Sequence, residues 1–211
     1  MALLILAGCS TVHRVTVDAI SDRTKAMGTT YHLEVNDPTG GVEAATHAAA
    51  IAHIKDALGA RGLFEVPASV KPDMVIDATY GVGHGHVSIV TEQNTNIMLG
   101  VGMTPPPNSK AIVVYDKTIE LTAHAPGPTG AASGRKERNG EELWSVKATI
   151  TDPKQDVSIF LASLASACID YIGENPGKEV ILPVDAAHAK VLLQQRLPTP
   201  GATPAPATPA K

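Results

Sequence analysis

Aromatic side chains are scarce in this chain, at 3% of 211 residues. A core with so few aromatics must be built from Val, Ile, Leu and Ala, and it offers few flat surfaces on which nucleic-acid bases could stack. Positive charge is also limited, because 17 Lys and Arg stand against 21 Asp and Glu, for a net charge of −4. Domains that bind nucleic acid concentrate Lys and Arg. The composition therefore argues against a nucleic-acid partner.

The chain begins with an apolar run that is too short to cross a membrane. A spanning helix needs about 20 apolar residues, whereas this run covers only residues 3–6 before small residues follow. Small residues that close an apolar stretch are typical of a signal-peptide cleavage site. The order Leu-Ala-Gly-Cys at 6–9 resembles the lipobox of bacterial lipoproteins. This resemblance implies cleavage between Gly8 and Cys9 and a lipid on Cys9.

One expected part of such a signal is missing. A signal peptide normally begins with a basic segment, and no basic residue precedes this apolar run. We therefore expect the natural start to lie upstream of Met1. We interpret residues 1–8 as signal peptide and 9–10 as the lipid-attachment segment, with an apolar first strand and an incidental cysteine as the alternative. Ser10, in place of aspartate, favours outer-membrane sorting in the class that the motif resembles.

Cysteine is also rare, with two residues in the whole chain. If Cys9 carries lipid, Cys168 has no disulfide partner. Cys168 lies at helical spacing from Phe160, Leu161 and Leu164, and this pattern predicts a buried side chain. A buried free cysteine behaves as a small hydrophobe, so we do not expect Cys168 to be a catalytic nucleophile.

Alternating apolar and polar residues predict several half-buried strands. These segments are 11–20, 29–35, 63–66, 73–80, 111–125 and 143–151. The glycine-rich residues 81–90 can continue the strand before them. Residues 91–110 read as a loop, because three consecutive prolines cannot lie within a sheet.

Two helices are marked by apolar residues at helical spacing. The first covers 44–58, and Gly62 is well placed to end it. The second is predicted to begin with Asp152 as its N-cap and Pro153 at its first position. It is predicted to end at Gly173.

The order of these elements indicates an α+β fold, with a mostly antiparallel sheet and two or three helices packed on one face. The folded domain is expected over 11–184. A C-terminal helix is expected over 185–197, and the Pro/Ala/Thr-rich residues 198–211 predict a disordered tail.

The order of several phrases along the chain is also informative. They are the lipobox, Tyr31 leading a strand, "IKDALGARGLF" at 54–64, Asp73 opening "DMVIDATY", "ELWSVKATI" at 142–150 and "DVSIFLASLASACIDYI" at 156–172. Together they resemble a family of bacterial lipoproteins of unknown function, over roughly residues 11–173. The resemblance implies an envelope lipoprotein with an α+β domain. It implies no activity, cofactor or catalytic residue.

His84 and His86 are weak candidates for a metal site. In an extended segment they would project from one face, and two such nitrogens can bind zinc or copper. A zinc site still needs a third or fourth ligand, and no Cys, Asp or Glu lies nearby at a conventional spacing. The glycines around them do not match a dinucleotide fingerprint, because His86 stands where glycine is needed and a β-rich segment follows.

Three further residues invite a catalytic interpretation. Asp73 and Asp77 fall on one face of a strand, as in a paired carboxylate site, but outward carboxylates on a solvated face are far commoner. His47 lies on the apolar stripe of the first helix, which predicts a hydrogen-bonded core or edge histidine.

The sequence therefore favours a non-enzymatic lipoprotein, tethered through Cys9, in a structural or protein-interaction role. It would present its domain to the periplasm from the outer membrane of a bacterial envelope, with an unidentified envelope protein as partner and no cofactor. The alternative is a periplasmic metal-binding protein or hydrolase that uses His84 and His86. A small-ligand carrier with a cavity between sheet and helices is a third possibility.

Overall fold

The computed structural model describes residues 11–36, 43–92, 108–127 and 139–195. The strands in these ranges are β1 (Val12–Ser21), β2 (Thr30–Asn36), β3 (Phe64–Glu65), β4 (Met74–Val82), β5 (His86–Glu92), β6 (Asn108–Pro126), β7 (Asn139–Asp152) and β8 (Val180–Asp185). The helices are α1 (Ala44–Ala60), α2 (Leu161–Cys168) and α3 (Ala186–Gln195), with short 3-10 segments η1 (Val157–Ile159) and η2 (Ile169–Tyr171). The lipobox with Cys9 and the expected tail at 198–211 lie outside the described residues.

The strands form a mixed sheet in the order β3-β2-β4-β6-β7-β1-β8, and β5 pairs with β6 outside this path. The prediction of an α+β fold holds, but the expected mostly antiparallel sheet is corrected to a mixed one. β2 runs parallel to both β3 and β4. The connection through α1 accounts for the pairing with β3, because a strand that returns after a crossover helix pairs in parallel with the strand before it. The connection 66–73 then leads from β3 to β4 on the other side of β2.

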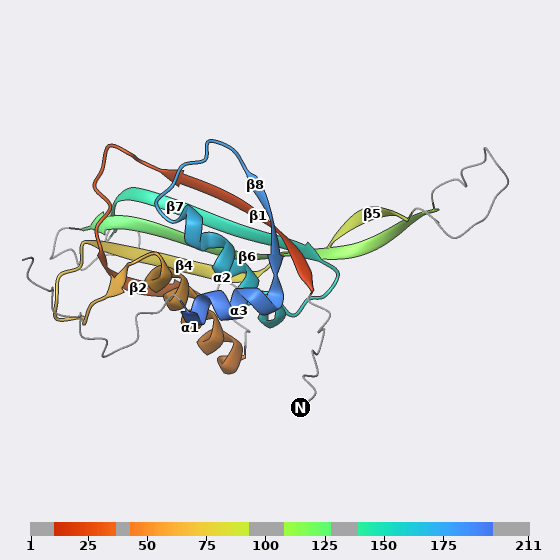
Figure 1. Ribbon diagram of the computed structural model, residues 1–211, viewed down its shortest axis with the longest axis horizontal. Coiled ribbons are helices and arrows are strands. Elements are labelled where there is room, and N and C mark those ends of the chain that lie inside the picture. Colours follow the sequence, from red (N-terminus) through yellow and green to blue (C-terminus); the bar gives the residue numbers. More distant parts are fainter. Residues whose placement is uncertain (1–10, 37–42, 93–107, 128–138, 196–211) are drawn as a thin grey trace, which may run out of the picture.

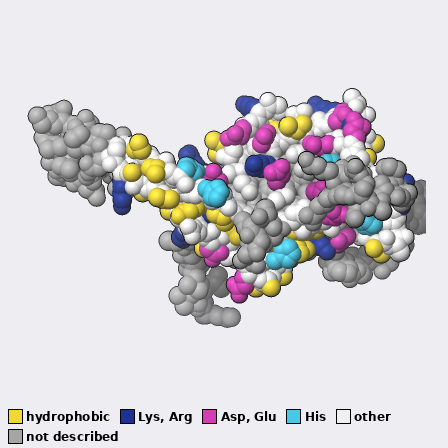
Figure 2. Space-filling model, turned by 180° about the vertical axis from the view of Figure 1, so that it is seen from behind, with side chains coloured by type: hydrophobic (Ala, Val, Ile, Leu, Met, Phe, Trp, Pro, Cys, Tyr) yellow, Lys and Arg dark blue, Asp and Glu magenta, His cyan; other side chains and the backbone are white. Residues whose placement is uncertain are grey.

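Among the described elements, the helices cover one face of the sheet, and Figure 1 shows the three helices together on that face. One row of paired residues facing the helices is fully buried: Val17, Ala148, Ile119 and Tyr80. The next row points to the open face and is largely polar: Asp18, Lys147, Glu120 and Thr79. Figure 2, seen from behind, shows acidic and basic side chains on the body. Alternation with period two thus separates core from surface.

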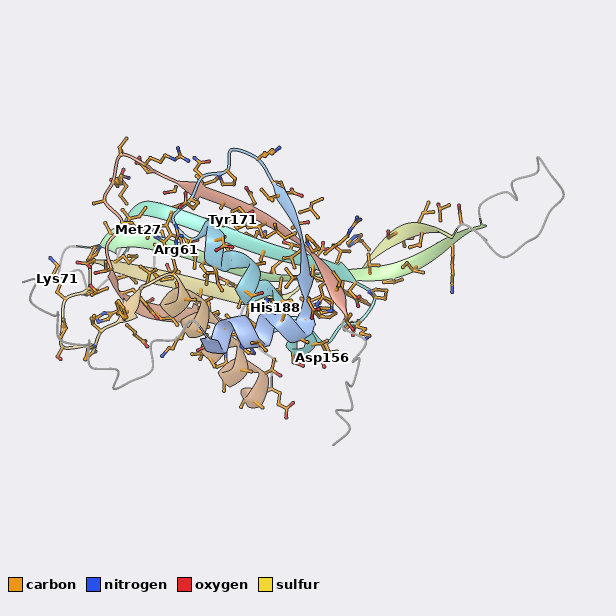
Figure 3. All side chains as sticks on the ribbon, viewed as in Figure 1. Met27, Arg61, Lys71, Asp156, Tyr171 and His188 are labelled. Atoms are coloured by element: carbon orange, nitrogen blue, oxygen red, sulfur yellow. The ribbon has the colours of Figure 1, made fainter. Side chains whose placement is uncertain are left out.

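The first helix forms where its apolar spacing predicts it. α1 buries Ala50, Ile54 and Leu58 against the core, and it ends before Gly62, whose φ of 88° suits glycine. Arg61, at the end of α1, donates a 3.1 Å hydrogen bond from Nε to the carbonyl of Ile172. Figure 3 shows Arg61 beside Tyr171, so the ends of two helical segments far apart in sequence are tied together.

The predicted start of the second helix is wrong. β7 continues to Asp152, and α2 begins only at Leu161. The Asp152 carboxylate accepts the Lys154 N–H at 2.8 Å, which makes a local turn instead of a helix cap. Asp156 accepts the Ser158 N–H at 2.9 Å and so caps η1. α2 is therefore shorter than the helix that the apolar spacing predicts between Asp152 and Gly173.

The last helix belongs to the same body as the rest of the domain. Asp185 caps α3 by accepting the N–H groups of Ala187 and His188 at 2.8 and 3.1 Å. Ala189 and Leu193 of α3 are buried in the common core. α3 lies within the range 185–197 where a C-terminal helix was expected, and it helps to cover the sheet. Residues 196 and 197 lie outside the described residues.

One-sided burial predicts opposite results for two neighbours on β6. Replacing the fully buried Ile119 with Ala should lower the free energy of unfolding by about 2–5 kcal/mol, because a cavity replaces buried apolar contacts. Replacing Thr118, on the open face, with Ala should change it by about 1 kcal/mol or less. Urea unfolding followed by fluorescence of Trp144, the chain's one tryptophan, measures both. Equal losses in the two variants would contradict one-sided burial.

Candidate functional site

A two-stranded projection is the most distinctive surface feature of the described chain (Figure 1). β5 pairs with β6 over 108–114, whereas β6 pairs with β7 only from Tyr115 onward. Among the described strands, β5 has no partner besides β6. We call the two segments 86–92 and 108–114 the arm. It extends one strand of the sheet beyond the layer of helices.

One face of the arm is apolar and exposed. Val87 lies opposite Val113, and Ile89 lies opposite Ala111. The exposed fractions of Val87, Ile89 and Val113 are 68%, 73% and 50%. We call Val87, Ile89, Ala111 and Val113 the apolar face. Hydrophobic side chains run along the arm in Figure 2, and contiguous exposed apolar patches commonly mark interaction sites.

The arm leaves the body at a buried lysine. Lys117 is fully buried, and its Nζ donates hydrogen bonds to the main-chain carbonyls of Tyr115 and Asp152, the pair at which β6 and β7 part. The Phe160 ring lies 5.1 Å from Nζ and adds a cation–π contact. Lys117 therefore fastens the root of the arm to the sheet.

The two histidines proposed as metal ligands lie at this root. His84 falls in the connection between β4 and β5, so it does not share a strand with His86, the first residue of β5. His86 Nδ1 lies 3.9 Å from a carboxylate oxygen of Asp116. Within the described ranges, no three His, Cys, Asp or Glu side chains are grouped so that they could hold a metal ion. The structure thus brings no ligand set to His84 and His86.

The carboxylates Asp73 and Asp77 have separate partners. Asp73 precedes β4, and its Oδ2 accepts the N–H groups of Thr29 and Thr30 at 3.0 and 2.9 Å. Hydrogen bonds from Thr30 and Thr29 hold the pKa of Asp73 below its usual value. Asp77 lies on the open face of β4, with its Oδ2 3.5 Å from Nε2 of His124. Asp73 therefore satisfies main-chain N–H groups at the start of β2.

His47 and Cys168 lie where the sequence places them. Nδ1 of His47 is 2.6 Å from the hydroxyl of the buried Tyr80, which confirms a hydrogen-bonded histidine at the core edge. Cys168 is fully buried, as predicted. Burial raises the pKa of its thiol to about 12. A thiol in this state is a poor nucleophile, because the thiolate is the reactive form.

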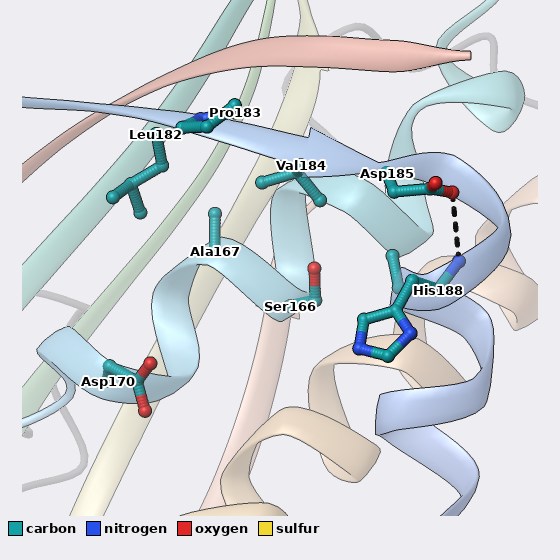
Figure 4. A pocket seen from close by; sticks show the side chains of 9 residues that line it. Ser166, Ala167, Asp170, Leu182, Pro183, Val184, Asp185 and His188 are labelled. Atoms are coloured by element: carbon teal, nitrogen blue, oxygen red, sulfur yellow. Dashed lines mark hydrogen bonds between the residues drawn. The ribbon is translucent and has the colours of Figure 1, made fainter. Parts of the chain in front are cut away.

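A small cavity lies between β8 and the helices α2 and α3 (Figure 4). Its volume is about 200 Å³, and its polar lining residues include Ser166, Asp170 and His188. The Ser166 hydroxyl donates to the carbonyl of Ser163 at 3.1 Å, so it is not held by a histidine as in a serine hydrolase. Ligand pockets usually exceed about 300 Å³, so this cavity gives little room to the carrier that the sequence left open.

A larger hollow, of about 420 Å³, lies on the open face beside β2. His32, Glu34 and Lys71 supply its polar groups. The His32 ring nitrogen Nε2 lies 3.1 Å from the carbonyl of Pro67, so it helps to hold the loop that forms one wall. The hollow is broad and solvated, and it does not lie between the sheet and the helices.

Comparison with known proteins identifies no family. No protein-family model matches the chain, and no curated protein matches it. Among solved structures, a PDZ domain protein from Parabacteroides distasonis is 13% identical with a TM-score of 0.44, covering 83% of this chain but only 40% of that one. The PelC dodecamer from Paraburkholderia phytofirmans is 14% identical with a TM-score of 0.42, covering 76% of this chain and 99% of that one. A single-substitution variant of that dodecamer is 13% identical, with a TM-score of 0.40 and coverages of 77% and 98%.

The buried lysine predicts a pH dependence of stability. Desolvation lowers the pKa of Lys117 below its usual 10.5, and Asp152 and Asp116 only partly oppose this. Below the lowered pKa the penalty of burying the charge is fully present, and it disappears as the pH rises to 10.5. The stability of the wild type relative to Lys117→Met should therefore rise between neutral pH and about pH 10. Urea unfolding of both proteins across this range measures the difference. A difference that stays flat or falls would contradict the assignment.

Burial of Cys168 predicts an unreactive thiol. In protein that begins at residue 10, so that Cys168 is the one cysteine, a thiol reagent such as 5,5′-dithiobis(2-nitrobenzoic acid) should react only after denaturant is added. Absorbance of the released thiolate measures the rate. Rapid reaction of the native protein at neutral pH would show that Cys168 is accessible.

Proposed function

We propose that this chain is a lipid-anchored protein of the bacterial envelope, held by lipid on Cys9 in the outer membrane and facing the periplasm. Its role is structural or in protein interaction and not enzymatic. The observation that carries the proposal is the lipobox-like Leu-Ala-Gly-Cys at 6–9, which ends just two residues before the described fold begins at Thr11. Two extended residues span at most about 7 Å, so a lipid there would hold the domain directly against the bilayer.

The start of the fold is firmly attached to the body. The carbonyl of Thr11 accepts the N–H of Ala186 at 3.0 Å, and Val15 and Val17 of β1 are fully buried. A pull on Cys9 would therefore be transmitted to the sheet. Each buried lipid methylene contributes about 0.8 kcal/mol, and two or more chains give stable anchoring. None of the helices in the described part of the chain has the length and apolar character to span a bilayer.

The non-enzymatic role is supported by the structural use of the candidate catalytic groups. Asp73 binds main-chain N–H groups, His47 binds Tyr80 and Cys168 is buried. The exposed arm supports a role in interaction. The alternative of a metal-binding protein or hydrolase through His84 and His86 is favoured by no observation of the described residues.

Acylation can be tested with the two cysteines of the chain. Expressed behind a complete basic leader in a Gram-negative host that is fed an alkyne-tagged palmitate, the wild type should incorporate the label and lose the leader together with residues 1–8. Cys9→Ala should incorporate none and leave the membrane fraction. Cys168→Ala is the matched control, since it removes the other sulfur, and it should be labelled like the wild type.

Mass spectrometry of the N-terminal peptide provides the decisive result. A peptide that begins at residue 9 with acyl mass on the sulfur is expected, and globomycin should block its formation. A free Cys9 thiol with residues 1–8 still attached, in protein made behind a complete basic leader, would refute the anchor.

A further inference from the structure

The apolar face of the arm is free of charge. The pairs Val87–Val113 and Ile89–Ala111 are followed by Thr91 and Ser109, which are also paired. Side chains alternate between the faces of a ribbon, so Lys110, opposite Val90, belongs to the other face. The exposed side chains of Val87, Ile89 and Val113 therefore lie on a face of the arm that carries no charged residue among those described.

The arm and the start of β1 lie at the same end of the sheet. Thr16 of β1, Thr149 of β7 and Thr118 of β6 lie in one row. From this row, four residues lead back along β1 to Val12 and four lead back along β6 to Val114, where the arm begins. Strands rise about 3.3 Å per residue, so both points lie roughly 13 Å from the row. Figure 1 shows the beginning of β1 and the arm at the same end of the body.

From this geometry we propose that the apolar face of the arm binds the bilayer surface, as a second membrane contact beside the lipid. The choice of a bilayer rests on the proposed lipid on Cys9, which lies three residues before Val12. A chain of three residues reaches at most about 10 Å, so the anchored membrane lies within reach of the arm. The lipid and the arm together would fix the orientation of the domain on the membrane as well as its location.

The backbone of the arm sets the depth of this contact. Among the described strands, β5 pairs only with β6, and β6 at 108–114 pairs only with β5. Each strand therefore leaves one row of N–H and C=O groups without a neighbouring strand. Unsatisfied backbone groups are excluded from hydrocarbon. The arm consequently lies in the interfacial layer, with Val87, Ile89 and Val113 toward the acyl chains and its edges hydrated.

Vesicle binding by protein without lipid tests the arm alone. Every core residue lies between Val15 and Leu193, so protein that begins at residue 10 retains the whole fold and lacks Cys9. It should sediment with vesicles of phosphatidylethanolamine and phosphatidylglycerol. In Val87→Thr/Ile89→Thr, which keeps β-branched side chains but removes apolar surface, the ratio of bound to free protein should fall about tenfold or more.

The matched control removes apolar surface elsewhere. Ile20 and Ile181 are 60% and 63% exposed on β1 and β8, away from the arm. Ile20→Thr/Ile181→Thr should bind vesicles like the parent protein. Trp144 fluorescence, since Trp144 is buried in the body, confirms that both variants are folded. In a further variant, Ile89→Trp, the new tryptophan should be quenched by brominated lipids.

Three outcomes would overturn the proposal. They are no vesicle binding by the parent protein, equal losses in the arm variant and its control, and a dimer in solution that Val87→Thr/Ile89→Thr abolishes. The last would show that a second copy of the chain covers the apolar face. Because this protein lacks Cys9, vesicle binding does not depend on acylation, so failure of the arm and failure of the lipid anchor are distinguished.

Discussion

The structure depends on how far the helices reach over one face of the sheet. Along β6 the same alternation of side chains runs from Asn108 to Pro126. Where helices cover it, Ile119 and Leu121 are buried in the core. Before Tyr115 no described helix covers the strand, and Val113 is half exposed. The arm therefore follows from a strand that is longer than the layer protecting it. One face of β6 thus contributes Ile119 and Leu121 to the core at one end of the strand and the exposed Val113 to the arm at the other.

Several polar side chains in unusual environments make structural contacts in this fold. Lys117 bonds carbonyls where β6 and β7 part, and Asp73 bonds the N–H groups that lead into β2. His13 forms a buried 3.0 Å hydrogen bond with Ser163, and burial lowers the pKa of His13. Unpaired backbone groups are costly when buried, so the ends of a sheet are where such residues stabilise most. Their unusual environments have a structural cause.

The features that could be predicted from the sequence are those that depend on the residue pattern of a single helix or strand. The helix at 44–58 and the burial of Cys168 follow from apolar spacing alone, and both are confirmed. The parallel pairing of β2 with β3 and β4 depends on the paths of α1 and of the connection 66–73 across the sheet, and local alternation does not contain these paths. The predicted start of α2 was wrong because it took Asp152 as the N-cap, whereas the side chain of Asp152 accepts the N–H of Lys154 in a local turn. The arm was missed because residues 81–90 were taken to continue the strand before them and the prolines at 105–107 marked 91–110 as loop. The four consecutive apolar residues at 111–114 do not alternate, so they give no sign of an exposed two-stranded ribbon.

An isolated two-stranded ribbon is only marginally stable in water. The arm meets this limit by being fixed at its root, where Lys117 fastens β6 and where a Cβ at Gly85 would come within 2.8 Å of the Tyr115 ring. Beyond the root, the described residues hold it by cross-strand pairs such as Val87–Val113. A bilayer can cover such a face without matching its shape, because the hydrophobic effect is non-directional. A lipid on Cys9 would also raise the local concentration of bilayer around the arm. With such a lipid in place, the affinity of the three exposed aliphatic side chains for a bilayer would act at high local concentration and would orient the domain.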